Sequence, residues 1–288
     1  MSVIVAVHGI GQQFKGDAII HREWWPALLS GLHLAGRNLA DPNALVCPFY
    51  GHLFRAAGAL GAAEIDSAEV TAEEEALLES WWHEAARLEP DRVTSPQHYA
   101  SQQSLVRTPM LIQRALNALA QSSFFADVYQ NLIIGDLRQV TLYLNDRGIH
   151  DQARDIVRNA ITPETRVVIG HSLGSVVAYE ALCCDSRNAV SFITIGSPLG
   201  IRNVVFDRLT PNPGFYGLGV WPGNIQHWTN IADNGDVVAL EKELARCFGP
   251  RVRDARIYTG SDAHHGERYL TARETGDAVG EGVWAKDC

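Results

Sequence analysis

Short continuous apolar runs alternate along the chain with longer segments in which apolar residues recur every three or four positions. Continuous runs rich in β-branched residues are typical of strands buried on both faces of a parallel sheet, whereas the longer spacing is typical of helices. The strand-like runs are Val3–Val7, Ala44–Tyr50, Val167–Ile169, Val190–Ile195, Gln226–Ile231 and Ala255–Thr259. Because helical segments separate them, the pattern predicts an α/β fold with a mostly parallel central sheet of five to six strands.

Between the second and third of these runs, helical spacing takes over. A capping-box match, Thr71-x-x-Glu74, precedes one of the helical segments. Helices are expected at 21–37, 77–88, 111–119, 124–144 and 150–160. We therefore predict a single domain over residues 1–288 in which residues 55–135 form a helical cap insertion.

Composition narrows the functional classes. Apolar residues make up 46% of the 288 residues, which is enough for a sizeable core. The net charge is −9 and no Lys/Arg-rich run occurs, which argues against nucleic acid and against charge-driven binding to anionic membranes. No stretch approaches the ~18 apolar residues that cross a bilayer, so no transmembrane segment is expected.

Cysteine use and the N-terminus predict a cytoplasmic protein. The cysteines are scattered, odd in number and without C-x-x-C or Cys/His ligand spacing, so we expect free thiols in a reducing compartment. They are Cys47, Cys183, Cys184, Cys247 and Cys288. The first residues, MSVIVAVHG, lack a basic region and carry only a short apolar run, so they predict a strand rather than a signal peptide.

The stretch RVVIGHSLGSVVAYEAL, residues 166–182, carries the strongest chemical signal. A buried-type strand is followed by a sharp turn, Gly170-His171-Ser172-Leu173-Gly174, and then by a helix with small residues on one side. In that context G-x-S-x-G predicts a nucleophile elbow, in which the serine hydroxyl projects above the sheet and side chains at the two glycines would collide with neighbouring elements. The N-terminus of the following helix favours developing negative charge.

This stretch resembles the α/β-hydrolase superfamily, and GHSLG is similar to its lipase and esterase branches. The first strand ends in His8-Gly9-Ile10-Gly11, which resembles the loop that supplies a second oxyanion donor. The resemblance implies a reduced α/β-hydrolase fold with Ser172 as nucleophile and the backbone N–H groups of Ile10 and Leu173 as the oxyanion hole. His8 lies in the wrong loop for a catalytic base and is expected to pack and to form hydrogen bonds.

The family order of serine, acid and histidine directs the search for the other two residues. The fifth strand runs into Ala-Asp-Asn-Gly-Asp-Val-Val, where Asp236 resembles the triad acid more closely than Asp233, although both fit a turn. After the last strand, His264 resembles the family histidine more closely than its neighbour His265, and both stay open. Asp262 lies close to the two histidines in sequence, but adjacent histidines rarely share one ion, so we expect no metal.

Two aromatic groups have two interpretations each. Trp81 and Trp82 either pack the core of the cap or line an acyl pocket. Phe215, Tyr216 and Trp221 lie in a loop rich in Pro and Gly, and they either rim the pocket or belong to a packed surface loop.

The resemblance covers about residues 1–55 and 160–270, and it implies a serine hydrolase that cleaves a carboxylic ester through an acyl-enzyme. The substrate would be a small-molecule or lipid acyl ester, and no cofactor is expected. Two alternatives stay open: a thioesterase or acyltransferase that uses the same triad, and a non-catalytic binding protein with this fold. The family's first two strands are missing, so the sheet edge is expected to be covered either by other residues of the chain or by a partner subunit in a homo-oligomer.

Overall fold

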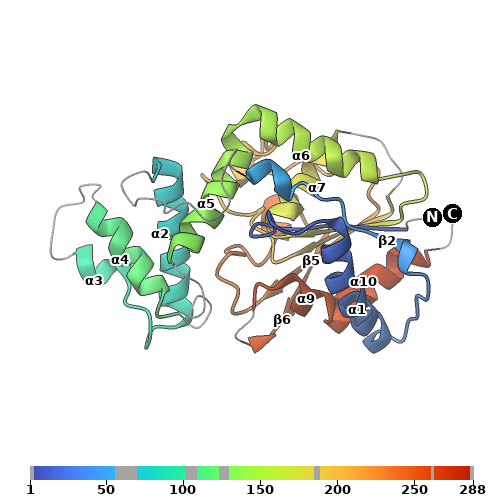
Figure 1. The fold of residues 1–288 in the computed structure, drawn as a ribbon, viewed down its shortest axis with the longest axis horizontal. Helices are drawn as coiled ribbons and strands as arrows, with labels where there is room; N and C mark the ends of the chain where they lie inside the picture. The colour runs from blue at the N-terminus through green and yellow to red at the C-terminus, as the bar shows by residue number, and fades with distance from the viewer. Residues whose placement is uncertain are drawn as a thin grey trace.

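A computed structural model describes residues 3–55, 70–100, 109–122, 130–184, 189–260 and 263–285. These residues form an α/β fold around one six-stranded sheet in the order β2-β1-β3-β4-β5-β6, and all neighbouring strands are parallel (Figure 1). The strands are β1 (Ile4–Val7), β2 (Leu45–Val46), β3 (Val167–His171), β4 (Ser191–Ile195), β5 (His227–Asp233) and β6 (Val252–Ile257). The predicted fold class is therefore confirmed.

Helices cover both faces of the sheet because the strands are apolar on both sides. Alternate residues of β1 belong to different cores: Ile4 lies in the cluster that includes α1 residues, and Val5 in the cluster that includes α6 and α7 residues. The first face carries α1 (Asp17–Leu34), α9 (Gly266–Leu270) and α10 (Arg273–Val283); the second carries α6 (Arg147–Ala160) and α7 (Leu173–Cys183). Each core is completed by strand side chains that are almost wholly buried.

The second strand is shorter than the predicted Ala44–Tyr50, because only Leu45 and Val46 pair with β1. The chain leaves the sheet after Val46, and Pro48, which has no N–H to donate, could not continue the ladder. It forms a 3-10 turn, η2 (Gly51–Phe54), and the Tyr50 ring stacks on His8 with 4.3 Å between ring centroids. The short pieces η1 (Pro42–Ala44), η4 (Phe206–Arg208) and α8 (Ala245–Phe248) complete the body.

Among the residues that the structure describes, four helices lie in or run out of the region where the insertion is predicted. They are α2 (Ala72–Leu88), α3 (Pro96–Ala100), α4 (Pro109–Leu119) and α5 (Gln130–Asn145). In Figure 1 the helices α2, α3 and α4 lie at one end of the molecule, beyond the sheet, and α5 runs from them back to α6. The predicted boundary at residue 135 therefore falls inside one continuous helix. The capping box at Thr71 and Glu74 is formed.

The Trp81 and Trp82 side chains are 2% and 0% exposed and lie in one apolar cluster with Ala115 and Leu119 of α4. The indole N–H of Trp82 donates to the Thr94 carbonyl at 2.7 Å. This places the tryptophan pair in the packing between the inserted helices. None of the helices in the described ranges is long and apolar enough to cross a membrane, and the four cysteines within those ranges are free thiols.

Candidate active site

Ser172 stands at the turn between β3 and α7, at the carboxyl edge of the sheet. Its backbone has φ 52° and ψ −132°, a region that a residue with a side chain rarely adopts. The neighbouring glycines make the turn possible. A β-carbon on Gly170 would lie 2.5 Å from the Ser175 Cα, and one on Gly174 would lie 2.2 Å from the His8 carbonyl oxygen. The predicted elbow is therefore formed, and Ser172 is 2% exposed.

Three side chains that are far apart in the sequence meet at this edge. The Nε2 atom of His264 lies 2.9 Å from the Ser172 hydroxyl oxygen, and its Nδ1 atom lies 2.8 Å from Oδ2 of Asp236. A carboxylate only accepts hydrogen bonds, so Nδ1 carries the proton and Nε2 is left to accept the serine proton. The His265 side chain is exposed at the position before α9, so the structure brings the first of the two adjacent histidines to the serine.

The Asp236 carboxylate is fully buried and held at both oxygens. Oδ1 accepts from the backbone N–H groups of Val238 at 2.8 Å and Ala239 at 3.2 Å, and Oδ2 also accepts from the Tyr269 hydroxyl at 2.7 Å. Burial acts to raise the pKa of Asp236, but the nearby His264 charge and these hydrogen bonds outweigh it and lower the pKa to about 2. The acid is therefore ionised across the neutral range and fixes the imidazole tautomer.

Asp233, the other candidate acid, supports the backbone instead. Its carboxylate accepts from the Gly235 N–H at 2.7 Å and from the Thr259 N–H at 2.5 Å. Its own N–H donates to the Tyr269 hydroxyl at 2.9 Å, so Tyr269 connects the two aspartates. Nothing in the sequence pattern indicates that Tyr269 is a partner of Asp236.

The loop after β1 passes directly beside the serine. A β-carbon on Gly9 would lie 2.6 Å from the Ser172 Cβ, so only glycine fits there. Within the described part of the chain, the backbone N–H groups of Ile10 and Leu173 have no hydrogen-bond partner. These are the two donors that the sequence predicts for the oxyanion hole, and the structure brings their loops together at Ser172.

His8 sets the direction of the first donor. Its Nδ1–H donates to the Gly9 carbonyl at 2.8 Å, and its Nε2 accepts from the Tyr50 N–H at 3.3 Å. Burial lowers the pKa of His8 to about 4, so the ring stays neutral and keeps this tautomer. The Gly9 carbonyl and the Ile10 N–H belong to one planar peptide and point in opposite directions. Anchoring the carbonyl therefore aims the Ile10 N–H away from His8.

His171, the second residue of the elbow, packs against His264. Its Nε2–H donates to the His264 carbonyl oxygen at 2.7 Å, and the two ring centroids are 4.9 Å apart. Burial, followed by the nearby His264 charge, lowers the pKa of His171 to about 3. His171 is therefore a neutral support for the loop. The sequence placed it only as the variable residue of G-x-S-x-G.

The inserted helices contact the site on two sides. On α5, Gln139 accepts from the Gly11 N–H at 3.3 Å. On α2, Glu84 lies 3.7 Å from the ammonium of Lys242, a buried lysine that itself donates to the Asp236 carbonyl. One helix thus contacts the loop after β1, and another contacts the lysine that bonds to the Asp236 backbone.

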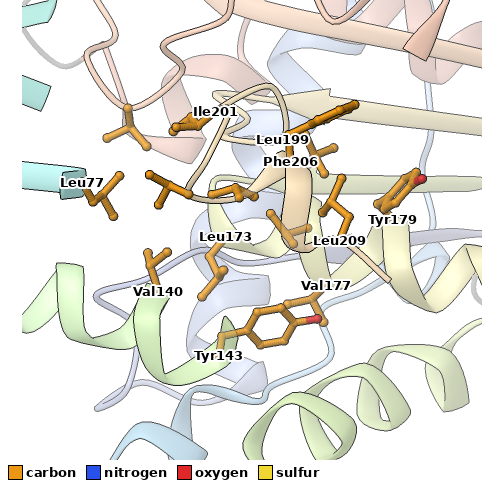
Figure 2. Packing of buried hydrophobic residues seen from close by; sticks show 14 of the residues in the cluster. Leu77, Val140, Tyr143, Leu173, Val177, Tyr179, Leu199, Ile201, Phe206 and Leu209 are labelled. Carbon is orange, nitrogen blue, oxygen red and sulfur yellow. The ribbon is translucent and has the colours of Figure 1, made fainter. Parts of the chain in front are cut away.

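Apolar side chains fill the space between the cap and the elbow. In Figure 2, Leu173 is surrounded by Leu77 of α2, Val140 of α5 and Ile201 from the loop after β4. All four belong to the larger core cluster and are at most 5% exposed. The side chains packed around Leu173, directly after Ser172 in the sequence, are therefore apolar.

The aromatic side chains of the loop at 215–221 do not gather around Ser172 as a group. Phe215 and Tyr216 are 99% and 90% exposed. The Trp221 ring packs under Arg251, whose guanidinium carbon is 4.0 Å from the ring centroid, and its N–H donates to the Ile225 carbonyl at 2.8 Å. The surface-loop interpretation therefore describes this segment.

No group of three or more His, Cys, Asp or Glu side chains is arranged to hold a metal ion among the residues that the structure describes. Asp262, which lies next to the histidine pair in sequence, is outside those residues.

The parallel sheet, the elbow and the loop after β1 give an architecture that is consistent with a reduced α/β-hydrolase fold. Comparison of the chain with protein-family models, with curated proteins and with solved structures returns no match.

Proposed function

We propose that the protein is a serine hydrolase that cleaves carboxylic esters. The single observation that carries this proposal is the unbroken chain of hydrogen bonds from Asp236 through His264 to Ser172, which ends at a serine on a strained elbow. A binding protein has no need of all three groups in one line. The strained backbone at the serine also fits a reactive group that the surrounding fold holds in place.

In the proposed reaction, the Ser172 oxygen attacks the ester carbonyl carbon while His264 Nε2 takes the hydroxyl proton. The imidazolium that forms is stabilised by the ionised Asp236. The same proton then passes to the leaving alcohol, and an acyl-enzyme remains. A water molecule attacks the acyl carbon with His264 again as the base, and the serine is regenerated with release of the acid.

Negative charge develops on the carbonyl oxygen in each tetrahedral intermediate. The N–H groups of Ile10 and Leu173 are the proposed donors, and the N-terminus of α7 adds a favourable field. Loss of one such donor typically lowers the rate about 10²–10³-fold. The apolar surroundings of Leu173, which include Leu77, Val140 and Ile201, suit the hydrocarbon part of a small-molecule or lipid acyl ester.

A fluorophosphonate probe together with nitrophenyl esters of graded chain length tests this function. The wild-type protein is expected to be labelled and to hydrolyse at least one ester, whereas Ser172→Ala is expected to lose both. Ser197→Ala is the matched control, because this buried hydroxyl bonds to Ser175 at 2.7 Å and to the Leu199 N–H at 3.2 Å. Absence of labelling and of ester hydrolysis in the folded wild-type protein would refute the proposal.

A further inference from the structure

A carboxyl group of the cap lies inside the candidate site without belonging to the triad. Asp136 sits on α5, one helical turn before Gln139, so the two side chains share a face of the helix. Gln139 accepts from the Gly11 N–H and donates to the Gln13 side chain at 3.4 Å, which fixes that face against the oxyanion loop.

The Asp136 carboxyl lies near Gly11 and near His264. Its Oδ1 atom is 3.6 Å from the place that a β-carbon on Gly11 would occupy, next to the proposed donor Ile10. The carboxyl is also within electrostatic range of His264, the proposed general base. The group therefore lies beside the loop that carries Ile10 and near the proposed base.

The carboxyl is partly buried and makes no hydrogen bond or ion pair with any residue that the structure describes. Other acids at this edge of the sheet are fully bonded, as Asp236 and Asp233 show. A polar group without a partner away from water carries a desolvation cost. Burial raises the pKa of Asp136 to about 7, and the His264 charge only partly offsets this.

We propose that Asp136 recognises a hydroxyl group of the substrate beside the scissile ester, a proposal that rests on the proposed hydrolase function. A hydroxyl donates to a carboxylate and accepts from a carboxylic acid, so it satisfies the group in both protonation states. An ammonium group would need the ionised form, which burial disfavours. The substrate class that follows is a hydroxylated ester, of a polyol or a hydroxy acid, rather than a plain alkyl ester.

In this proposal the apolar and polar residues near Ser172 have separate roles. Leu77, Val140 and Ile201 would contact hydrocarbon, whereas Asp136 would form a hydrogen bond to the hydroxyl. A site that bonds a substrate hydroxyl discriminates against the analogue that lacks it, because the protein group is then left unpaired. Asp136 is thus a specificity residue and not a member of the triad.

The test compares kcat/KM for a matched ester pair, glyceryl monobutyrate and propyl butyrate. In the wild-type protein we expect the glyceryl ester to be preferred. In Asp136→Leu the ratio of the two values is expected to fall about tenfold to a hundredfold, the range for a hydrogen bond to a charged group. Asp136→Asn keeps a donor and an acceptor and is expected to retain most of the preference.

Three outcomes are informative. Equal use of the two esters by the wild-type protein, or the same ratio in Asp136→Leu as in the wild type, would overturn the proposal while ester hydrolysis and fluorophosphonate labelling still support the hydrolase. A fall in the ratio only for the pair choline butyrate and 3,3-dimethylbutyl butyrate would assign an ammonium ligand and overturn the hydroxyl. Asp277→Leu, which removes a carboxylate on the exposed side of α10, is the charge-matched control and should keep the wild-type ratio.

Discussion

Asp236→Asn is the sharpest test of the proposed geometry, because the structure fixes which way the new amide must point. The backbone N–H groups of Val238 and Ala239 both donate to Oδ1, so the amide oxygen of asparagine has to take that position. The amide NH₂ then occupies the Oδ2 position and faces His264. An NH₂ group only donates, so Nδ1 must become an acceptor and the ring proton moves to Nε2.

A proton on Nε2 leaves no lone pair for the Ser172 hydroxyl, whose oxygen lies 2.9 Å away. The nucleophile then has no base, and kcat is expected to fall about 10⁴-fold, or about 5 kcal/mol in activation free energy. The Tyr269 hydroxyl also loses its acceptor at Oδ2. An unsatisfied buried donor costs about 1–3 kcal/mol, so the variant should unfold at lower denaturant concentration.

The assay measures kcat on a good nitrophenyl ester and urea unfolding on the same preparations. Asp233→Asn is the matched control. It also changes a buried aspartate that accepts two backbone N–H groups, but it does not face His264. The control should show a comparable loss of stability with kcat within about tenfold of wild type. If Asp236→Asn, still folded, keeps kcat within tenfold as well, the argument from amide orientation is wrong.

Three further predictions follow from the surroundings of the triad. His8→Leu removes the donor to the Gly9 carbonyl and frees the Ile10 peptide to rotate. In steady-state assays kcat should fall about 10–100-fold with KM little changed, and an equal rise in KM would contradict this role of His8. Gly174→Ala places a methyl group 2.2 Å from a backbone carbonyl oxygen at the end of β1, so thermal unfolding should show a loss of at least about 1–3 kcal/mol, and a wild-type midpoint would contradict the packing. A hydrogen bond to the buried Glu180 raises the pKa of His150 despite the partial burial of the ring, so its stabilising contribution is fully present below the ordinary value of 6.5 and is lost as the pH rises through the folded value. Urea unfolding should therefore show a larger cost of His150→Gln at about pH 5.5 than at about pH 8.5, and a pH-independent cost would refute the ion pair.

The parts of the site that are close in sequence could be predicted, because local backbone demands fix their residue types. Strand, G-x-S-x-G and helix identify the elbow without any distant contact, and the chain order of the acid and the histidine narrows the other candidates to two pairs. Distances then distinguish Asp236 from Asp233 and His264 from His265.

Contacts between distant elements left no such signal. Asp136 belongs to a helix whose apolar periodicity is clear, but a polar residue in that pattern is ordinarily solvent-exposed, so nothing in the sequence indicates that it lies beside the loop after β1. The length of β2 could not be predicted, because burial outside the sheet produces the same apolar pattern as burial in a strand. Cys47 and Tyr50 are buried as expected, but they lie beyond the two paired residues, and the Tyr50 ring packs on His8.

The continuity of α5 has one more consequence. Near the C-terminal end of the helix, the Tyr143 hydroxyl donates to Glu180 on α7, the helix that begins directly after Ser172. One turn earlier, Gln139 accepts from the Gly11 N–H in the loop after β1. A single helix therefore ties together two segments that flank Ser172, so a displacement of α5 would move both of them at once.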